Sequence, residues 1–335
     1  MTRMGAQRAS PAWPVVGHDW AVDLLRRAIA AGRPPHALLI TGPPNVGKGT
    51  LARSLAQALL CTADERPCNV CRPCRLVAHG NHPDLLWLEP EGGSLKIAQV
   101  RDLTRRLTLS PFEGAWQIAV LNRFELATAG AANALLKTLE EPPTDVVLVL
   151  LAQQAEALLP TIVSRCQVLA LRPLSRIVIE RALIERWGGT ADAATLLSHI
   201  CGGRLGWAVS AVTTPEPLET RTQRLDDLFR LLHNKRVGRF SYAEWLAKEP
   251  TEAILESLEL WIGWWRDVLL LSSDSRVPLT NIDRRGELGQ VADQCDLNTV
   301  RMSLSALQTT MDQLAHNANT RLALEVLLLT VPFLG

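Results

Sequence analysis

Hydrophobic positions in the first half of the chain follow the pattern of a parallel α/β fold. Three continuous apolar runs are typical of short strands that are covered on both faces: residues 36–40, 116–121 and 145–152. Apolar residues at helical spacing, or strong helix formers, predict helices around and between these runs: residues 16–33, 51–60 and 127–140. Strands that alternate with helices in this way indicate parallel βα units.

The pattern changes after Leu174, where no further strand is predicted. Three short helices follow: residues 176–187, 191–200 and 206–212. Residues 213–217 contain two prolines and are predicted to form a linker. From residue 218 to the end the periodicity is helical, with breaks near residues 272–278 and Gly286. The predicted fold class is therefore α/β followed by all-α.

Composition narrows the class of protein without changing this outline. The 335 residues include 35 basic and 34 acidic side chains, a net charge of +1, which argues against a strongly basic, self-sufficient nucleic-acid binder. No window approaches eighteen uninterrupted apolar residues, so no contact with a membrane is expected. Residues 1–14 contain charges and prolines but no apolar core, so they are not expected to act as a secretory signal. We expect a cytoplasmic protein.

A glycine-rich segment after the first strand nearly matches the phosphate-binding loop of nucleotide-binding proteins. It contains Gly42, Gly47, Lys48, Gly49 and Thr50. Glycines let backbone N–H groups converge on a phosphate, the start of the following helix adds a favourable dipole, and Lys48 would reach the β- and γ-phosphates. The residue after the lysine should be Ser or Thr, whose hydroxyl holds Mg²⁺. Here it is Gly49, and Thr50 comes one position too late.

The acidic half of an ATPase site is also changed. ATPases of this type end a buried strand with acidic residues that bind Mg²⁺ and polarise water. The strand predicted at 116–121 is followed instead by Asn122 and Arg123. Neither side chain can act as a general base, and Arg123 would bring positive charge to the metal position. The loop could still bind ATP or ADP, whereas hydrolysis is not expected.

Four of the seven cysteines lie within fourteen residues: Cys61, Cys68, Cys71 and Cys74. Four thiolates in one short loop suit tetrahedral Zn²⁺, and a site with four protein ligands has no open position for catalysis. We therefore expect structural Zn²⁺, which stabilises a loop with little core of its own. The alternative is a set of free or disulfide-bonded thiols. His79 and His82 lie nearby but are not needed as ligands.

The segment from Asn133 to Pro143, with the sequence NALLKTLEEPP, resembles the clamp-loader subunits of bacterial DNA polymerase III. The cysteine insert after the phosphate-loop helix and the tripeptide Ser164-Arg165-Cys166 carry the same resemblance. Members of this family share a AAA+ module, made of an α/β domain and a helical lid, and a helical collar for pentamer assembly. The resemblance therefore implies an α/β domain with the cysteine module at 61–74, a lid and a collar: residues 1–172, 173–214 and 218–335.

Within this family, the substitutions favour a subunit that does not hydrolyse ATP. Motor subunits, called gamma or tau, keep Lys-Thr in the phosphate loop and Asp-Glu after the second strand, where this chain has Lys48-Gly49 and Asn122-Arg123. The sensor position near Gln153 is also changed, and the lid arginine of motors falls on Gly206 or, after a short register shift, on Arg204. This pattern is similar to the delta-prime branch of the family. The alternative is an active motor subunit with an unusual loop.

The resemblance also implies a role for Arg165 outside its own chain. In the family, the arginine of the Ser-Arg-Cys tripeptide reaches across a subunit interface to the γ-phosphate held by a neighbouring motor subunit. A guanidinium is permanently charged and forked, which suits it to stabilise charge on a transferred phosphoryl group. Ser164 would orient or cap the turn. The alternative is a structural arginine paired with a local carboxylate.

The implied partners are the motor subunits and the delta subunit in a hetero-oligomeric ring, the sliding clamp, and primer–template DNA through the assembled complex. Three arginines on one predicted helix face could contact DNA, although a solvated face is the simpler interpretation: Arg101, Arg105 and Arg106. Three tryptophans at helical spacing favour core packing or the collar interface over base stacking: Trp261, Trp264 and Trp265. A zinc-dependent nucleic-acid-binding module is a third interpretation, which the near-neutral charge disfavours.

Overall fold

The computed structural model describes residues 13–316 and 318–334 of the chain. Residues 1–12, most of the segment in which no secretory signal is expected, lie outside the described residues. The chain divides into two compact units, which are described separately: Met1–Val178 with Gly203–Gly206, and Ile179–Gly202 with Trp207–Gly335. The division of the helical part into a lid at 173–214 and a collar at 218–335 stays a prediction.

The first unit is built around a parallel sheet of five strands in the order β2-β3-β4-β1-β5. The strands are β1 (Ala37–Thr41), β2 (Leu85–Leu88), β3 (Gln117–Leu121), β4 (Val146–Ala152) and β5 (Gln167–Ala170). Neighbouring strands are parallel, with Leu39 opposite Leu150 and Ala119 opposite Leu148. Every residue of β1, β3 and β4 is buried, as expected for apolar runs covered on both faces. The predicted fold class is confirmed.

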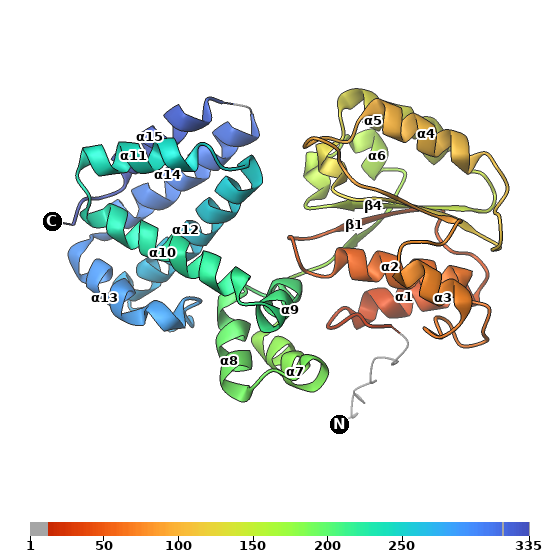
Figure 1. Cartoon of the computed structure of the whole chain (residues 1–335), viewed down its shortest axis with the longest axis horizontal. Helices are drawn as coiled ribbons and strands as arrows, with labels where there is room; N and C mark the ends of the chain where they lie inside the picture. The colour runs from red at the N-terminus through yellow and green to blue at the C-terminus, as the bar shows by residue number, and fades with distance from the viewer. Residues whose placement is uncertain (1–12, 317, 335) are drawn as a thin grey trace. The chain divides into compact units, whose positions relative to one another are not determined.

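Helices cover both faces of this sheet (Figure 1). One face is covered by α1 (Asp19–Ala30), α2 (Lys48–Leu60) and α3 (Arg72–Ala78), and the other by α4 (Ile97–Leu107), α5 (Ala129–Glu140) and α6 (Pro160–Val163). Because successive strand residues point to opposite faces, Ile40 joins the apolar cluster under α1 and α2, and Leu39 joins the one under α4 and α5. Short 3-10 helices lie at Phe124–Leu126 (η1) and Ala155–Ala157 (η2).

Helices make up the rest of the described chain. In order they are α7 (Arg176–Trp187), α8 (Ala191–Ile200), α9 (Leu205–Thr213), α10 (Glu216–His233), α11 (Arg236–Leu246), α12 (Thr251–Ser272), η3 (Ile282–Arg284), α13 (Arg285–Gln294), α14 (Leu297–Ala315) and α15 (Thr320–Thr330). Trp261, Trp264 and Trp265 of α12 are fully buried in the apolar core of α10–α15. Their prediction as core residues is confirmed, because no face of these rings is left for base stacking.

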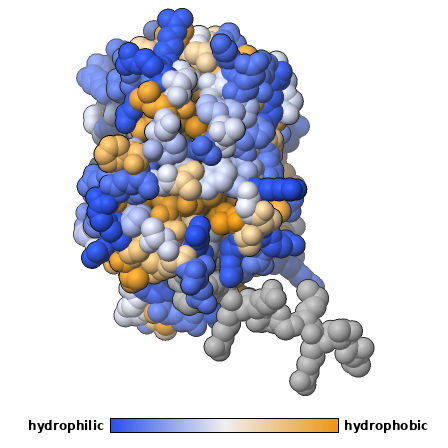
Figure 2. Space-filling view, turned by 90° about the vertical axis from the view of Figure 1, so that its right-hand side faces the viewer, coloured by the Kyte–Doolittle hydropathy of each residue, from blue (hydrophilic) through white to orange (hydrophobic). Residues whose placement is uncertain are grey.

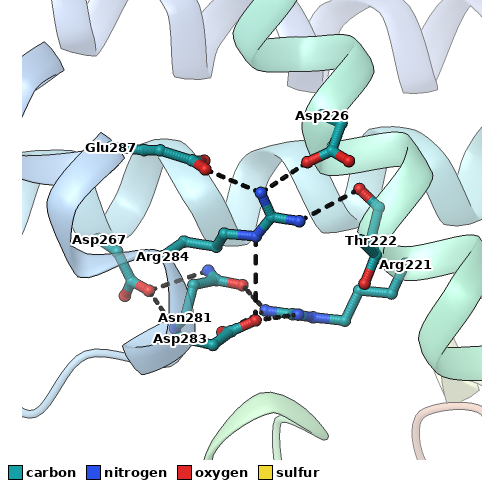
Figure 3. A network of polar contacts seen from close by, with 8 residues as sticks. All are labelled: Arg221, Thr222, Asp226, Asp267, Asn281, Asp283, Arg284 and Glu287. Carbon is teal, nitrogen blue, oxygen red and sulfur yellow. Dashed lines mark hydrogen bonds and ion pairs between the residues drawn. The ribbon is translucent and has the colours of Figure 1, made fainter.

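A buried polar network fixes the segment between α12 and α13 (Figure 3). The carboxylate of Asp267, buried on α12, accepts hydrogen bonds from the backbone N–H groups of Thr280 at 3.0 Å and Asn281 at 2.6 Å. The side-chain oxygen of Asn281 accepts from Arg221 of α10 at 2.7 Å, and Arg221 forms an ion pair with Asp283 at 2.7 Å. Because a buried charge is tolerated only when it is paired, the network holds this irregular segment in one place.

The structure differs from the predicted elements at the sheet edges and among the helices. The sequence pattern does not predict strands β2 and β5, which are the two edges of the sheet. The break predicted near residues 272–278 is present, whereas Gly286 lies inside α13, one residue after its start. The linker predicted at 213–217 is shorter, because α9 extends to Thr213 and α10 already begins at Glu216. Pro217 lies in the first turn of α10, where proline is well tolerated.

The face drawn in Figure 2 is mostly polar. In the view of Figure 2, hydrophilic side chains cover most of the surface, and hydrophobic ones form scattered patches. Large exposed apolar side chains include Leu109 and Phe112, in the loop that follows α4. Asp84 holds this loop, because its buried carboxylate accepts hydrogen bonds from the backbone N–H groups of Glu113 and Gly114 at 2.9 and 2.8 Å. Among the described residues, no helix has the length and apolarity needed to cross a membrane.

Candidate functional site

The phosphate loop joins the end of β1 to the start of α2 and has a backbone that its glycines allow. Gly42 and Gly47 have φ angles of 145° and 112°, a region that other residues rarely adopt. A Cβ at Gly42 would lie 2.5 Å from the carbonyl oxygen of Leu171, so glycine is required there. Gly47 directly precedes α2, whose first N–H groups have no partners within the helix. The backbone of the predicted loop is therefore shaped to receive an anion.

Lys48, the first residue of α2, is turned back onto its own loop. Its ammonium group donates to the carbonyl oxygens of Gly42 at 2.5 Å and Pro43 at 2.9 Å. Burial lowers the pKa of Lys48 to about 8, and the carboxylate of Glu125 partly offsets this effect. Thr50 is exposed. Carbonyl groups of its own loop thus hold the ammonium group that was expected to meet phosphate.

The position expected for a magnesium-binding hydroxyl faces an indole ring. A Cβ at Gly49 would have the Cη2 and Cζ2 atoms of Trp87 as its nearest neighbours, each at 4.0 Å. The indole N–H of Trp87 donates to the Glu89 carboxylate at 2.7 Å, and the side-chain amide of Asn122 donates to the same carboxylate at 3.0 and 3.1 Å. The amide oxygen of Asn122 accepts from the backbone N–H of Arg123 at 3.1 Å. Asn122 is thus engaged in protein hydrogen bonds at the place where an ATPase presents a carboxylate to Mg²⁺.

The start of α9 packs directly on the phosphate loop, within the first unit. The backbone N–H of Gly206 donates to the carbonyl oxygen of Asn45 at 2.8 Å. A Cβ at position 206 would lie 2.9 Å from that oxygen, so a side chain there would displace the loop. Two positions were considered for the lid arginine. Position 206 accepts only glycine in this arrangement. The other candidate, Arg204, lies two residues before this contact.

The cysteines of the insert form one group, in which all sulfur atoms lie within 4.8 Å of one another: Cys61, Cys68, Cys71 and Cys74. They form no disulfide, and the sulfur atoms of Cys61 and Cys71 are 3.9 Å apart. Burial acts to raise the pKa of Cys71, but the backbone N–H groups of Cys74 and Thr62 and the neighbouring thiols lower it to about 6. The number, type and spacing of these donors fit a tetrahedral metal site.

Side chains of α2 tie the cysteine group to the phosphate-loop helix. The amide of Gln57 donates to the carbonyl oxygen of Cys74 at 3.0 Å, and the guanidinium of Arg53 donates to that of Ala78 at 3.0 Å. The same guanidinium lies over the Trp87 ring, 4.9 Å from its centroid. His82 is buried and is not part of the cysteine group. Folding of the insert is therefore coupled to the position of α2.

Arg165 lies between α6 and β5, at the surface of the first unit. Its Nη2 atom is 2.8 Å from Oε1 of Glu140, and its Nη1 atom donates to the carbonyl oxygen of Thr161 at 2.9 Å and to Oγ of Ser164 at 3.4 Å. Its side chain is 35% exposed. In the single chain Arg165 is thus paired with a local carboxylate. Its polar contacts within the described residues do not include the phosphate loop.

The three arginines of α4 are exposed: Arg101, Arg105 and Arg106. The helix buries Val100, Leu103 and Leu107 against the sheet, which leaves the arginines in solvent. Arg105 pairs with Asp102 on the same helix at 2.6 Å. This exposure fits a solvated face as well as a contact with nucleic acid.

Three residues of these sites are missing from the candidates chosen by sequence. Trp87 and Glu89 lie in and after β2, which the hydrophobic pattern does not predict as a strand. Glu140 lies inside the NALLKTLEEPP segment. The sequence did contain a signal for Glu140. A carboxylate in the last turn of a helix interacts unfavourably with the helix dipole, which indicates that a cationic side chain lies close to it.

Comparison with known proteins gives consistent matches. A family model described as DNA polymerase III, delta subunit, matches residues 17–175. The DNA polymerase III subunit delta' of Bacillus subtilis is 32% identical over 313 residues, which cover 92% of this chain and 94% of the relative. The subunit delta' of Escherichia coli is 40% identical over 147 residues, 43% of this chain and 44% of the relative. The subunit tau of Salmonella typhimurium is 33% identical over 203 residues, 58% of this chain and 32% of the relative.

The match to the Bacillus subtilis protein spans nearly the full length of both chains, and the family model covers the unit that contains the phosphate loop, the cysteine group and Arg165. The subunit tau relatives match a shorter part of the chain at similar identity. On this evidence, the chain belongs to the DNA polymerase III subunit delta' family.

Proposed function

We propose that this chain is a clamp-loader subunit that does not hydrolyse ATP and that supplies Arg165 in trans to ATP held by a neighbouring motor subunit. Its partners would be gamma or tau motor subunits and a delta subunit in a hetero-oligomeric ring. The ring would load the sliding clamp on primed DNA. We also propose Zn²⁺ as the structural metal held by the four cysteines, because a four-thiolate set without an open position suits that ion.

The contacts of Asn122 are the observation that carries the proposal. ATP hydrolysis needs Mg²⁺, which prefers carboxylate and hydroxyl oxygens, and a group that orients the attacking water. Asn122 instead donates to Glu89, and Gly49 offers no hydroxyl toward the ring of Trp87. Lys48 already donates to its own loop. The pocket therefore keeps an anion-binding backbone without the groups that activate a phosphate for attack.

The environment of Arg165 supports a contact with another subunit. The side chain is partly exposed, and its three contacts within the described residues use at most three of the five N–H donors of a guanidinium. The remaining donors can meet phosphate oxygens presented by a neighbouring subunit. Such an arginine stabilises the charge that develops on the transferred phosphoryl group.

Substitution of Arg165 in a reconstituted complex tests this proposal. We expect Arg165→Ala to leave assembly intact and to slow hydrolysis at the adjoining motor site on the order of 10³-fold, the scale of arginine-finger effects. Pre-steady-state phosphate release from the complex, made with gamma or tau, delta and clamp, measures this loss as the disappearance of one kinetic phase.

The matched control is Lys48→Ala in the same chain. Because the proposal gives Lys48 no part in hydrolysis, this variant should retain the phase that Arg165→Ala removes. Full turnover by Arg165→Ala would contradict the trans role of the arginine. Loss of a phase in Lys48→Ala would favour the alternative, a chain that is itself an active motor.

A further inference from the structure

Glu140 and Arg165 join the two segments by which this chain resembles its family. Glu140 is the last residue of α5 and lies within NALLKTLEEPP, and Arg165 lies 25 residues later in the Ser-Arg-Cys tripeptide. The Nη2–Oε1 distance of 2.8 Å is that of a charge-assisted hydrogen bond. The carboxylate lies at the C-terminal end of α5, where the helix dipole disfavours negative charge. The positive charge of Arg165 offsets this unfavourable interaction.

The helix that carries Glu140 is a rigid support. Leu135 and Leu139 of α5 are buried in the cluster between the sheet and α4, and Thr128 caps the start of the helix through the N–H of Ala131. The carboxylate therefore projects from an element whose position is set by core packing, whereas Arg165 follows a helix of only four residues. A long flexible side chain in a short loop is thus held by a group on a rigid helix.

The contact with Glu140 orients the guanidinium of Arg165 and leaves N–H donors for a phosphate. Glu140 meets Nη2 at 2.8 Å, and the carbonyl oxygen of Thr161 holds Nη1 at 2.9 Å. These contacts remove part of the rotamer entropy of the arginine side chain before any phosphate arrives. An arginine oriented in advance reaches a transition state at a smaller entropic cost.

From this geometry we propose that Glu140 is a positioning residue, which orients the guanidinium of Arg165 for contact with the γ-phosphate of the neighbouring subunit. The proposal rests on the trans role of Arg165 given above. Glu140 touches no substrate and acts only through the arginine. Its removal should therefore slow the chemical step and leave the affinity of the motor subunit for ATP almost unchanged.

A double-mutant cycle in the reconstituted complex tests this role. We expect Glu140→Ala to slow the hydrolysis phase that depends on Arg165 by about tenfold, with KM for ATP within about twofold of the parent value. In the Arg165→Ala background, Glu140→Ala should have no further effect, because the group through which it acts is gone. Glu140→Asp should recover part of the rate. Thermal unfolding and sizing of each complex check that it is folded and assembled.

Glu141→Ala is the matched control, since this neighbouring glutamate is also exposed and takes no part in the ion pair. It should retain the parental rate. An unchanged rate in Glu140→Ala, with Arg165→Ala impaired, would overturn the positioning role and leave the proposed function standing. An equal loss from Glu140→Ala in both backgrounds would also overturn it, because the glutamate would then act independently of the arginine. If Arg165→Ala itself retains full turnover, the proposed function fails first.

Discussion

Lys48 shows how the role of one side chain depends on its surroundings. In a loop that holds nucleotide, this ammonium group would neutralise phosphate charge. Here it donates to the carbonyl oxygens of Gly42 and Pro43, and burial disfavours its charged form. The lysine is thus held by carbonyl groups of its own loop in this structure.

We expect Lys48 to titrate near pH 8 in the folded chain. Burial lowers its pKa from the ordinary value of 10.5, so between these values the unfolded chain binds more protons than the folded chain. The free energy of unfolding contributed by Lys48 should therefore rise with pH from about 8 to 10.5. Amine labelling at varied pH, followed by mass spectrometry, measures the midpoint at Lys48.

The same lysine in the urea-denatured chain serves as the control for this titration. Lys48→Met should remove the corresponding rise in stability above pH 8. A midpoint that is equal in the folded and denatured chains would refute the burial of the ammonium group described here.

Some of these residue-scale features could be predicted from the sequence, and some could not. Position 49 lacks the hydroxyl and position 122 lacks the carboxylate that hold Mg²⁺ in ATPases of this type, so residue type alone predicts weakened metal binding. The contacts of Trp87 and Glu89 with this site depend on β2 lying beside β3. That adjacency is tertiary, and no local pattern in the chain encodes it.

At the scale of elements, strands were predictable where burial is complete. The central strands β1, β3 and β4 are buried at every position, so their sequences form nearly continuous apolar runs. The edge strand β5 has only one buried residue in four, and β2 has four residues enclosed by polar and proline positions. Each edge strand has only four residues, and so short an apolar run cannot be told from part of a helix by its pattern, which is why both edges of the sheet were missed.

The cysteine group is an element whose folding should depend on metal. Chelation is expected to release about one Zn²⁺ per chain and to destabilise the first unit, because Gln57 and Arg53 connect the insert to α2. At free zinc about 1,000-fold above Kd, linkage predicts a loss of roughly 4 kcal/mol on chelation. Metal analysis and chemical denaturation, each with and without chelator, measure these two effects.

Cys71→Ser should lose the bound metal, whereas Cys295→Ser, in the second unit and outside the group, should retain it. A chain that is free of metal and yet keeps its full stability would rule out a structural metal here.

At the scale of the whole molecule, we propose that the chain combines a phosphate loop that does not support hydrolysis with an arginine that contacts ATP held by another subunit. Sequence motifs were sufficient to reach the family, because NALLKTLEEPP and Ser-Arg-Cys are specific strings. The position of Arg165 was not predictable in the same way. Under the proposed trans role, the functional partner of Arg165 lies in another chain, and within this chain its side chain pairs with Glu140.

The most direct test of the central claim is ATP turnover by a complex in which only this chain keeps its phosphate-loop lysine. The gamma or tau subunits would carry an alanine in place of their phosphate-loop lysine, and phosphate release would be followed in the presence of clamp, primed DNA and Mg²⁺. We predict no release above background, because Gly49 has no hydroxyl and Asn122 has no carboxylate to hold Mg²⁺. Mg²⁺-dependent release that is abolished by Lys48→Ala would contradict the account.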